Sequence, residues 1–402
     1  MNEAEERDIV IVGGGICGLA TALALHRKGI RSLVLERSEG LRATGAALTI
    51  RANGWRALDH LGLGSVLRKD SFHIDGCGIM KVDRGTKLEK LPLSKGEARC
   101  IKRSDLVEAL AKDLPQGTVR FGCHVISVKL DPVTSSAVLE LHNGFVIKAK
   151  VLIGCDGVNS AVLKYLHMNP TKFSATSAIR GFTSYPEGHE FENLFIIARK
   201  EQVLLGRVPV NDTLVYWFVT RLWTSIDSKI SENQQLIKMS SLETIKDFPE
   251  DMKEMIKNSD RSSLSCLRFR YRAPWDLMLG SFSKGTVTVA GDALHAMSPF
   301  IGQGGSASLE DAVVLARCLA QKILESDRNT ISDKCAMDKY EEALNQYGKE
   351  RRMRLIKLST QSYLQNKMFE TSSMVVKLFC IVILAVFFRD SVAHSQFDCG
   401  HL

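Results

Sequence analysis

Three glycines near the amino terminus have the spacing of a phosphate-binding turn. They follow a short apolar run, Asp8–Val12, and precede a stretch with helical periodicity, Ala20–Lys28. In the pattern G-x-G-x-x-G the first glycine permits a tight turn, the second lets the backbone approach a pyrophosphate, and the third lets the helix pack closely. Phosphates would lie at the helix N-terminus, where free N–H groups meet negative charge. The residues assigned to this predicted dinucleotide site are Gly13, Gly15, Ile16, Cys17 and Gly18.

An acidic residue stands at the end of the next predicted strand, Arg31–Leu35. This residue, Glu36, follows Gly18 by eighteen positions, where a carboxylate can accept hydrogen bonds from ribose hydroxyls. A free 2′-hydroxyl is present in FAD and NAD but not in NADP, so the acid disfavours NADP in this site. Its neighbour Arg37 is assigned to the same site.

Two later segments each place an Asp beside a Gly at the end of an apolar strand. They read VLIGCDGVNS over 151–160 and VTVAGDALHAMSPFIGQGG over 287–305. Asp292 lies where a carboxylate can bind the ribityl chain of a flavin. The glycines after it lead into a helix whose N-terminus would face the flavin pyrimidine ring and stabilise its negative charge after reduction. The two segments therefore favour FAD over NAD.

The elements that would carry these residues begin as a strand–helix–strand unit, the start of a parallel sheet. Residues 137–148 predict a hairpin around Asn143-Gly144, and residues 151–154 predict a further apolar strand.

That order is interrupted and later resumes. Between about 170 and 275, strand-like runs alternate with turns, which indicates a mostly antiparallel sheet with a helical stretch near 234–257. A buried strand near 286–290 and helices near 306–325 and 337–366 follow. The sequence predicts a nucleotide-type α/β fold that a second sheet interrupts.

With its motifs in this order, the chain resembles the class A FAD-dependent aromatic hydroxylases, a family that includes para-hydroxybenzoate hydroxylase, salicylate hydroxylase and zeaxanthin epoxidase. It is most similar to plant monooxygenases near the last two, over about residues 7–330. The resemblance implies a Rossmann-like FAD-binding domain interleaved with a mixed or antiparallel substrate-domain sheet, followed by C-terminal helices. The implied divisions are 1–170 (with substrate-domain strands at 70–100), 171–275, 276–330 and 331–402.

The resemblance also assigns residues to the flavin. Gly13–Gly18 and Glu36 would hold ADP, and the loop Arg42–Ala47 would contact the ribityl chain and isoalloxazine. Arg103 matches an arginine that touches the flavin. The remaining implied contacts, in the two Asp-Gly segments and in that loop, are Arg42, Gly45, Ala46, Asp156, Gly157, Gly291, Asp292, Pro299, Gly302, Gly304 and Gly305.

The implied reaction begins with transient NAD(P)H reducing bound FAD. Reduced flavin reacts with O₂ to give a C4a-hydroperoxide, whose distal oxygen passes to a carbon of a small electron-rich substrate. No side chain is assigned a catalytic role, and a loop with Pro299, Gly302, Gln303 and Gly304 lies beside the flavin. Two alternatives stay open: an FAD oxidase or reductase without oxygen insertion, and a flavin-binding protein without turnover that docks to a membrane or a partner.

Three positions depart from the family pattern. Leu163 ends the motif Asp-Gly-x-x-Ser-x-x-Arg, with Lys164 beside it, and Ala296 follows His295 where the family usually has Pro. Phe300 stands where plant relatives often carry Asp. His295 is expected to support its loop. No second G-x-G-x-x-G unit is present for the nicotinamide coenzyme, which fits transient docking.

Composition excludes several functional classes. The 53 Lys and Arg against 45 Asp and Glu give a net charge of +8. The sequence has no block of five or six like charges, so a nucleic-acid partner is not expected. The ten Cys do not form metal-ligand spacings with the ten His, so no metal site and no structural disulfide is expected. An intracellular, reducing compartment is the expected location.

An apolar segment near the carboxyl end is bounded by Lys377 and Arg389. Leu378–Phe388 is eleven apolar residues long, whereas a helix that spans a bilayer needs ~20. The favoured interpretation is a buried terminal helix, with peripheral membrane or partner contact as the alternative. Residues after Arg389 are expected to form a loose tail.

Overall fold

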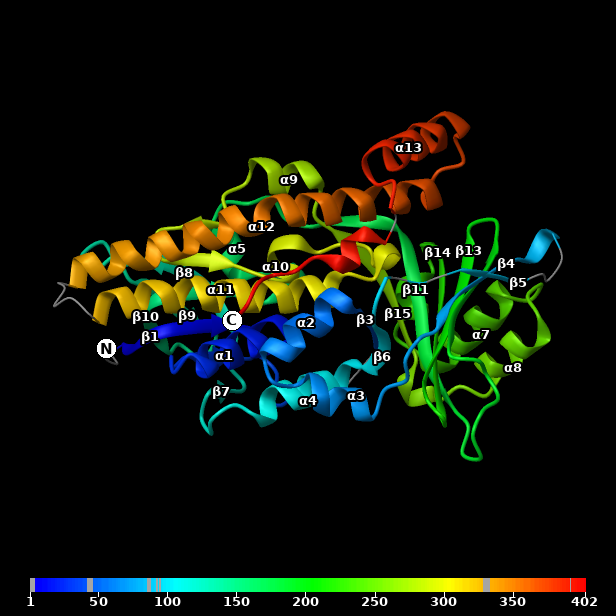
Figure 1. Ribbon diagram of the computed structural model, residues 1–402, viewed down its shortest axis with the longest axis horizontal. Coiled ribbons are helices and arrows are strands. Elements are labelled where there is room, and N and C mark those ends of the chain that lie inside the picture. The colour runs from blue at the N-terminus through cyan, green and yellow to red at the C-terminus, as the bar shows by residue number, and fades with distance from the viewer. Residues whose placement is uncertain are drawn as a thin grey trace.

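The computed structural model describes residues 4–41, 46–84, 88–91, 93, 95–327, 333–390 and 392–402. Within these residues the chain forms two large sheets placed side by side along the long axis of the molecule, and long helices cover the first sheet (Figure 1). The predicted fold class is confirmed: parallel and antiparallel strands combine with C-terminal helices.

The first sheet has eight strands and a parallel centre. Its main path is β16-β17-β10-β1-β2-β7, with β9 pairing with β10 and β8 pairing with β9. The pairs β1–β10, β1–β2, β10–β17 and β2–β7 are parallel, and the predicted hairpin at 137–148 is confirmed as the antiparallel pair β9–β10. The strands are β1 Glu5–Val12, β2 Leu33–Leu35, β7 Val119–Arg120, β8 Val125–Leu130, β9 Ala137–Leu141, β10 Val146–Gly154, β16 Ser283–Lys284 and β17 Val287–Val289.

Both faces of the first sheet are buried, which explains why its strands are apolar throughout. Ile9 and Ile11 of β1 face one core cluster, and Val10 and Val12 face another. The helices packed on and beside this sheet are α1 Ile16–Arg27, α2 Ala52–His60, α3 Gly64–Lys69, α4 Arg103–Lys112, α5 Ala161–Tyr165, α9 Pro274–Leu279, α10 Asp292–His295, α11 Gly304–Asp327 and α12 Asp333–Glu370.

The second sheet has seven strands, of which only the pair β4–β12 is parallel. Helices α7 and α8 cover one face, where Val215, Trp217 and Val219 of β14 point. The elements of this region are β4 Gly76–Lys81, β5 Leu88–Leu91, β11 Lys172–Ser184, β12 Leu194–Lys200, β13 Val203–Asn211, β14 Leu214–Leu222, β15 Ser265–Tyr271, α6 Asp227–Ile230, α7 Gln234–Thr244 and α8 Glu250–Lys257.

A two-stranded sheet joins the two regions. Its strands, β3 (Ala47–Arg51) and β6 (Ala98–Lys102), pair in antiparallel register. Ala47, Ala98 and Cys100 share a core cluster with the second sheet, whereas Ile50 and Ile101 belong to the core of the first. The alternation of side chains along these strands therefore connects both cores.

The carboxyl-terminal expectations were wrong in two respects. The apolar segment forms helix α13 (Met374–Phe387), but most of its side chains are exposed, with only Cys380 buried. No helix among the described residues is long and apolar enough to cross a bilayer.

The residues after Arg389 pack closely instead of forming a loose tail. The Arg317 guanidinium donates to the carbonyl oxygens of Cys399 at 2.7 Å and His401 at 2.9 Å. The Phe397 ring lies 4.4 Å from the Arg354 guanidinium. The last residues therefore pack against the helices of the first sheet. Figure 1 shows them as the red segment that ends near α11.

Candidate functional site

The carboxyl ends of four parallel strands meet at one edge of the first sheet. Val12 pairs with both Leu35 and Gly154, and Gly154 pairs with Val289. The residues that follow these strand ends carry the predicted motifs, so the register brings them together. Open α/β sheets bind ligands at this edge, where helix N-termini point.

The glycine turn between β1 and α1 has a different constraint at each glycine. Gly13 has φ +105°, and a Cβ added there would collide with the carbonyl oxygen of Cys155. A Cβ at Gly18 would collide with the carbonyl oxygen of Gly13. At Gly15 an added Cβ would meet only the Arg103 guanidinium, at 4.0 Å. The turn is therefore closed on the protein side and open on the Gly15 side, the shape that a pyrophosphate needs.

Glu36 is buried against this turn. Its carboxylate accepts hydrogen bonds from the backbone N–H groups of Gly14 at 2.7 Å and Ser38 at 2.9 Å. It thus holds the turn, and a carboxylate has further lone pairs for ribose hydroxyls. Arg37 is exposed and Ile16 is half-buried.

Cysteines connect the three motifs. The Cys17 Sγ lies 3.6 Å from the Cys155 Sγ, and a Cβ added at Gly291 would lie 2.7 Å from the Cys17 Cβ. The contact with Cys155 and burial raise the pKa of Cys17 well above its usual value, so this thiol stays neutral. These cysteines pack the motifs against one another and are not suited to nucleophilic chemistry.

Arg103 begins α4 beside the open side of the glycine turn. Its backbone N–H donates to the Ala46 carbonyl oxygen at 2.9 Å, which ties it to the end of the predicted flavin loop. The guanidinium is directed toward Gly15, which places a cation where the cofactor's phosphates would lie. Arg42 and Gly45, also assigned to the flavin, lie outside the described residues.

The first Asp-Gly segment caps a short helix. Asp156 Oδ2 accepts the Ala161 N–H at 2.7 Å, whereas Oδ1 is buried without a partner. Burial raises the pKa of Asp156, and a ligand donor at Oδ1 would relieve that cost. Gly157 has φ +75°. Leu163 is buried in the core and Lys164 is exposed.

The second Asp-Gly segment faces the start of α11. Asp292 is exposed, and its Oδ1 lies 4.0 Å from a Cβ added at Gly304. Gly302 is left-handed with φ +60°, and a Cβ there would meet nothing within 4 Å. An open N-terminus of a 24-residue helix with a free carboxylate beside it therefore borders the edge of the sheet. The other assigned residues of this loop, Pro299 and Gly305, flank it.

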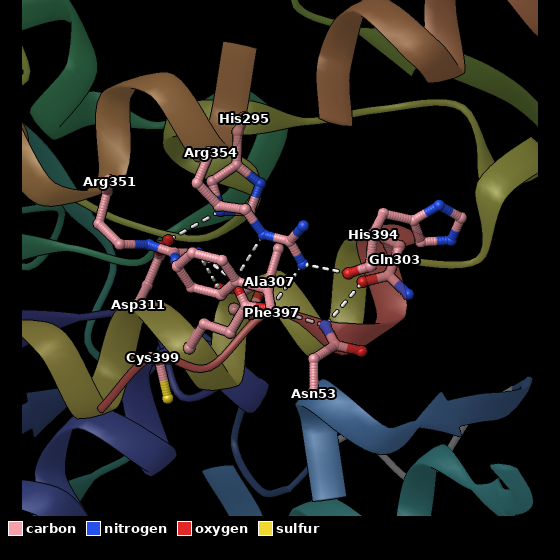
Figure 2. Close-up of polar contacts among 12 residues, drawn as sticks. Asn53, His295, Gln303, Ala307, Asp311, Arg351, Arg354, His394, Phe397 and Cys399 are labelled. Atoms are coloured by element: carbon pink, nitrogen blue, oxygen red, sulfur yellow. Dashed lines mark hydrogen bonds and ion pairs between the residues drawn. The ribbon is translucent and has the colours of Figure 1, made fainter. Parts of the chain in front are cut away.

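Behind this loop lies a buried network of charged residues that was not predicted from the sequence (Figure 2). Asp311 Oδ2 accepts the Gly291 N–H at 2.9 Å and lies 2.7 Å from His295 Nε2, while Oδ1 accepts Arg351 Nε at 2.7 Å. Burial opposes ionisation of Asp311, but His295 and Arg351 outweigh it and lower its pKa to about 2. His295 is fully buried and supports the loop, as expected.

The same network reaches the Gln303 loop and the carboxyl terminus. Asn53 Nδ2 donates to Gln303 Oε1 at 2.8 Å and to Glu310 Oε1 at 2.6 Å. Arg354 donates to Glu310 at 2.8 Å and to the His394 carbonyl oxygen at 2.7 Å. Two adjacent acids within the small and apolar residues of the first half of α11 were the sequence signal for these buried pairs, because such charges need partners.

An aromatic layer lines the other face of the second sheet, toward β3 and β6. The Tyr216 ring lies 5.4 Å from Phe182 and 6.1 Å from Phe218, and Phe195 lies 6.1 Å from Phe218. The three phenylalanines are only half-buried although they belong to an inner cluster. Burial raises the pKa of Tyr216 to about 12, with Arg180 as the nearby cation. The layer is apolar with one polar group, as substrate pockets are.

A hollow of about 1530 Å³ lies elsewhere, lined by residues such as Glu6, Arg31 and Thr118. It opens at the amino ends of the parallel strands, opposite the motifs. None of the described residues assigned to the cofactor lines this hollow, so it is not the predicted cofactor site.

Residues 6–352 match the protein family described as "FAD binding domain". Monooxygenase 1 of Arabidopsis thaliana is 50% identical over 399 residues, covering 99% of this chain and 100% of that protein. Monooxygenase 2 of Arabidopsis thaliana is 38% identical over 409 residues, covering 100% of both.

Solved structures share the fold. Klebsiella pneumoniae HpxO complexed with FAD and uric acid is similar with a TM-score of 0.77 and 19% identity, over 98% of this chain and 97% of that chain. A tetrameric 2-methyl-3-hydroxypyridine-5-carboxylic acid oxygenase has a TM-score of 0.72 and 21% identity, over 94% and 96%. The family match and the two Arabidopsis relatives show that the chain belongs to the class A family of FAD-dependent monooxygenases.

Proposed function

We propose that this monooxygenase takes two electrons from NAD(P)H and places one oxygen atom of O₂ in a small electron-rich substrate, aromatic or polyene-like, by hydroxylation or epoxidation. The second oxygen atom leaves as water. The observation that carries the proposal is the glycine turn, which is closed at Gly13 and Gly18 but open at Gly15 beside Arg103. Besides this turn, the chain has an aromatic layer on the second sheet, formed by Phe182, Phe195, Tyr216 and Phe218, that can contact a substrate.

The residues proposed to hold FAD follow the edge of the first sheet. The turn, Glu36 and Arg103 suit the ADP part, because a helix N-terminus and a guanidinium attract its diphosphate. Asp156 with Gly157, and Asp292 with the nearby N-terminus of α11, suit the ribityl and ring part. The full proposed set is Gly13, Gly15, Ile16, Cys17, Gly18, Glu36, Arg37, Arg42, Gly45, Ala46, Arg103, Asp156, Gly157, Gly291, Asp292, Pro299, Gly302, Gly304 and Gly305.

Bound FAD supplies the activation of O₂ and the oxygen transfer, so no side-chain nucleophile is required. The chain's own residues bind, orient and exclude water. The N-terminus of α11 favours negative charge at the loop. The buried pairs of Asp311 and Glu310 hold that loop against α12, so its donors are fixed before substrate arrives.

The aromatic layer of Phe182, Phe195, Tyr216 and Phe218 is proposed to bind the substrate. Its rings provide an apolar contact that excludes water, and aromatic faces stack on planar substrates. With a pKa of about 12, Tyr216 keeps its proton at neutral pH and can donate a hydrogen bond. Arg180 beside it would favour a substrate with an acidic or carbonyl oxygen.

A division into lobes follows as a proposal. Residues 1–170 and 276–330 would form the FAD-binding domain, interleaved with a substrate domain of residues 171–275 and the strands at 70–100. Residues 331–402 would add the C-terminal helices. NAD(P)H would dock transiently, since the sequence has no second G-x-G-x-x-G unit to hold it.

The test uses the purified full chain. We expect a yellow protein with flavin absorption, and NAD(P)H oxidation that phenols, carotenoids or other electron-rich compounds accelerate with one oxygenated product. Peroxide release without an oxygenated product would instead support an oxidase. A chain that stays colourless after incubation with FAD would contradict the proposal altogether.

A further inference from the structure

Helix α13 exposes apolar side chains around most of its circumference. Val375 is 78% exposed, Phe379 64% and Phe387 76%. Seven more apolar residues share this outward surface, and they are Met374, Val376, Leu378, Ile381, Val382, Ala385 and Val386. A soluble protein rarely leaves such a contiguous apolar patch uncovered unless it binds something.

The helix touches the rest of the molecule along a narrow strip. Cys380 is buried, and Lys377, Leu384 and Phe388, which lie at helical spacing from it, are half-buried. With 3.6 residues per turn, the side chains outside this strip occupy roughly two-thirds of the circumference. None of the exposed side chains from 374 to 387 is polar.

A second exposed apolar group lies on α9. Trp275 is 44% exposed, Met278 59% and Leu279 83%. Both α9 and α13 pack on α12 and project from the same edge of the molecule in Figure 1. We call these two exposed groups together the α9–α13 surface.

The two halves of the α9–α13 surface adjoin one turn of α12. The Trp275 ring lies 5.5 Å from the Tyr363 ring, and the Lys367 ammonium lies 5.8 Å from the Tyr363 ring. Lys367 is also close enough to Cys380 of α13 for its charge to act on that thiol. The two exposed groups are therefore neighbours along the C-terminal half of α12.

Cations border the α9–α13 surface, and the two acids nearest to α13 along the chain, Glu370 and Asp390, are paired with Lys367 and Lys95. No acidic residue occurs between Glu370 and Asp390, whereas Lys377 and Arg389 flank the apolar run. The Lys172 ammonium lies 5.1 Å from the Trp275 ring. An apolar surface bordered by cations complements a layer of apolar chains beneath anionic headgroups.

We propose that the α9–α13 surface docks on an anionic lipid bilayer, with α13 lying in the headgroup region. A helix of 14 residues is about 21 Å long, whereas the hydrocarbon core is about 30 Å thick, so α13 lies on the membrane instead of crossing it. Lipid chains deform around a helix and can cover a wide apolar arc. Trp275 suits the interface, where Trp is enriched.

The experiment is flotation of the full-length protein with vesicles of phosphatidylcholine, alone or mixed with phosphatidylserine. We expect the protein to float with the mixed vesicles and less with phosphatidylcholine alone. The double variant Phe379→Glu/Val386→Glu should lose binding by more than about tenfold, because each withdrawn apolar side chain is worth about a factor of ten or more. Leu279→Glu should reduce binding, and Lys377→Gln/Arg389→Gln should remove the preference for phosphatidylserine.

The matched control is Val133→Glu, which adds the same charge at a 90% exposed apolar residue far from α13. It should float like the unchanged protein. As a second measurement, brominated lipids should quench the fluorescence of Trp275, and Trp275→Phe should remove that quenching. Trp55 and Trp217 are fully buried and would not respond, whereas Trp223 is half-buried, so the measurement is made in a Trp223→Phe background.

Two outcomes would overturn the inference. One is the absence of flotation with either vesicle, including the case in which the chain elutes as a dimer that Phe379→Glu disperses. The other is flotation that Phe379→Glu/Val386→Glu leaves unchanged. Flavin absorption of the same samples, measured without vesicles, reports on the proposed function separately, because none of these residues lies in the proposed FAD site.

Discussion

At Gly13 and Gly15, one added methyl group has opposite expected consequences although the residues are only two positions apart. Gly13 needs a positive φ and has backbone packed against it, so its role is internal to the fold. Gly15 is the N-cap of α1 in an extended conformation with φ −85°, which any residue adopts, and its missing side chain leaves room outside the fold. The glycine motif thus combines a folding constraint with a binding constraint.

The pair Gly13→Ala and Gly15→Ala separates these constraints. Gly13→Ala should lower the free energy of unfolding of the apoprotein by more than about 1 kcal/mol, because strain and collision add. Gly15→Ala should leave the apoprotein melting temperature nearly unchanged but reduce bound FAD, because its methyl group enters the phosphate space. Differential scanning fluorimetry and flavin absorption measure the two effects. Equal loss of stability in both variants would contradict the assignment.

Among the elements, α10, α11 and α12 are joined through buried charges. Asp311 of α11 contacts the N–H of Gly291, His295 of α10 and Arg351 of α12. Arg354 extends the connection to the carboxyl terminus through the His394 carbonyl oxygen. Breaking a buried pair leaves an uncompensated charge, which costs more than the pair contributes.

Acid should weaken this junction in a defined range. The pKa of Asp311 is lowered from 3.8 to about 2 in the folded chain, so the unfolded chain binds its proton first as pH falls. Its stabilising contribution is complete above pH 3.8 and is lost as pH falls through about 2. Urea unfolding across pH 5 to pH 2 should therefore show a steeper decline for the natural chain than for Asp311→Asn. Parallel declines would argue against an ionised Asp311.

Arg354→Met should destabilise the fold by about 3 kcal/mol, because it removes one of the two buried cations that pair with Glu310. The loss stays near this value because Arg351 remains as the other partner of Glu310. Release of the His394 carbonyl oxygen should also expose the last residues to proteolysis. Chemical denaturation and limited proteolysis measure the two effects. Arg31→Met, at an exposed arginine before β2, is the control and should change neither quantity.

At the scale of the whole molecule, cofactor and substrate functions are assigned to different sheets. The first sheet collects the cofactor motifs at its carboxyl edge. The second presents one face to α7 and α8 and its aromatic face to β3 and β6. The two-stranded sheet of β3 and β6 contributes residues to the cores of both large sheets. It therefore links the two sheets, although they share no strand.

This separation predicts a split between substrate and flavin effects. Phe218→Ala should raise the substrate concentration for half-maximal NAD(P)H oxidation by about tenfold, through lost apolar contact, while the amount of bound FAD stays constant. Phe145→Ala, at a 58% exposed ring in the β9–β10 hairpin, is the control and should leave both values unchanged. A loss of flavin in Phe218→Ala would place that ring in the cofactor site instead.

The sequence by itself determined the α/β order, the interrupting sheet and the positions of the three motifs. These features depend on local backbone needs, such as the positive φ of Gly13, and on the period of apolar residues, both of which are written in short stretches of chain. Only the tertiary structure decided the partners of Asp311 and Glu310, because they come from helices far along the chain.

The carboxyl-terminal region was decided by tertiary structure for the same reason. An apolar run reports the hydrophobicity of α13 but not whether other elements reach it, and here α12 packs against it along one strip. The polar residues after Arg389 gave no sign of packing, because their carbonyl oxygens are bound by Arg56, Arg317 and Arg354 from distant helices. Burial is a property of neighbours, and the chain brings those neighbours together only when it folds.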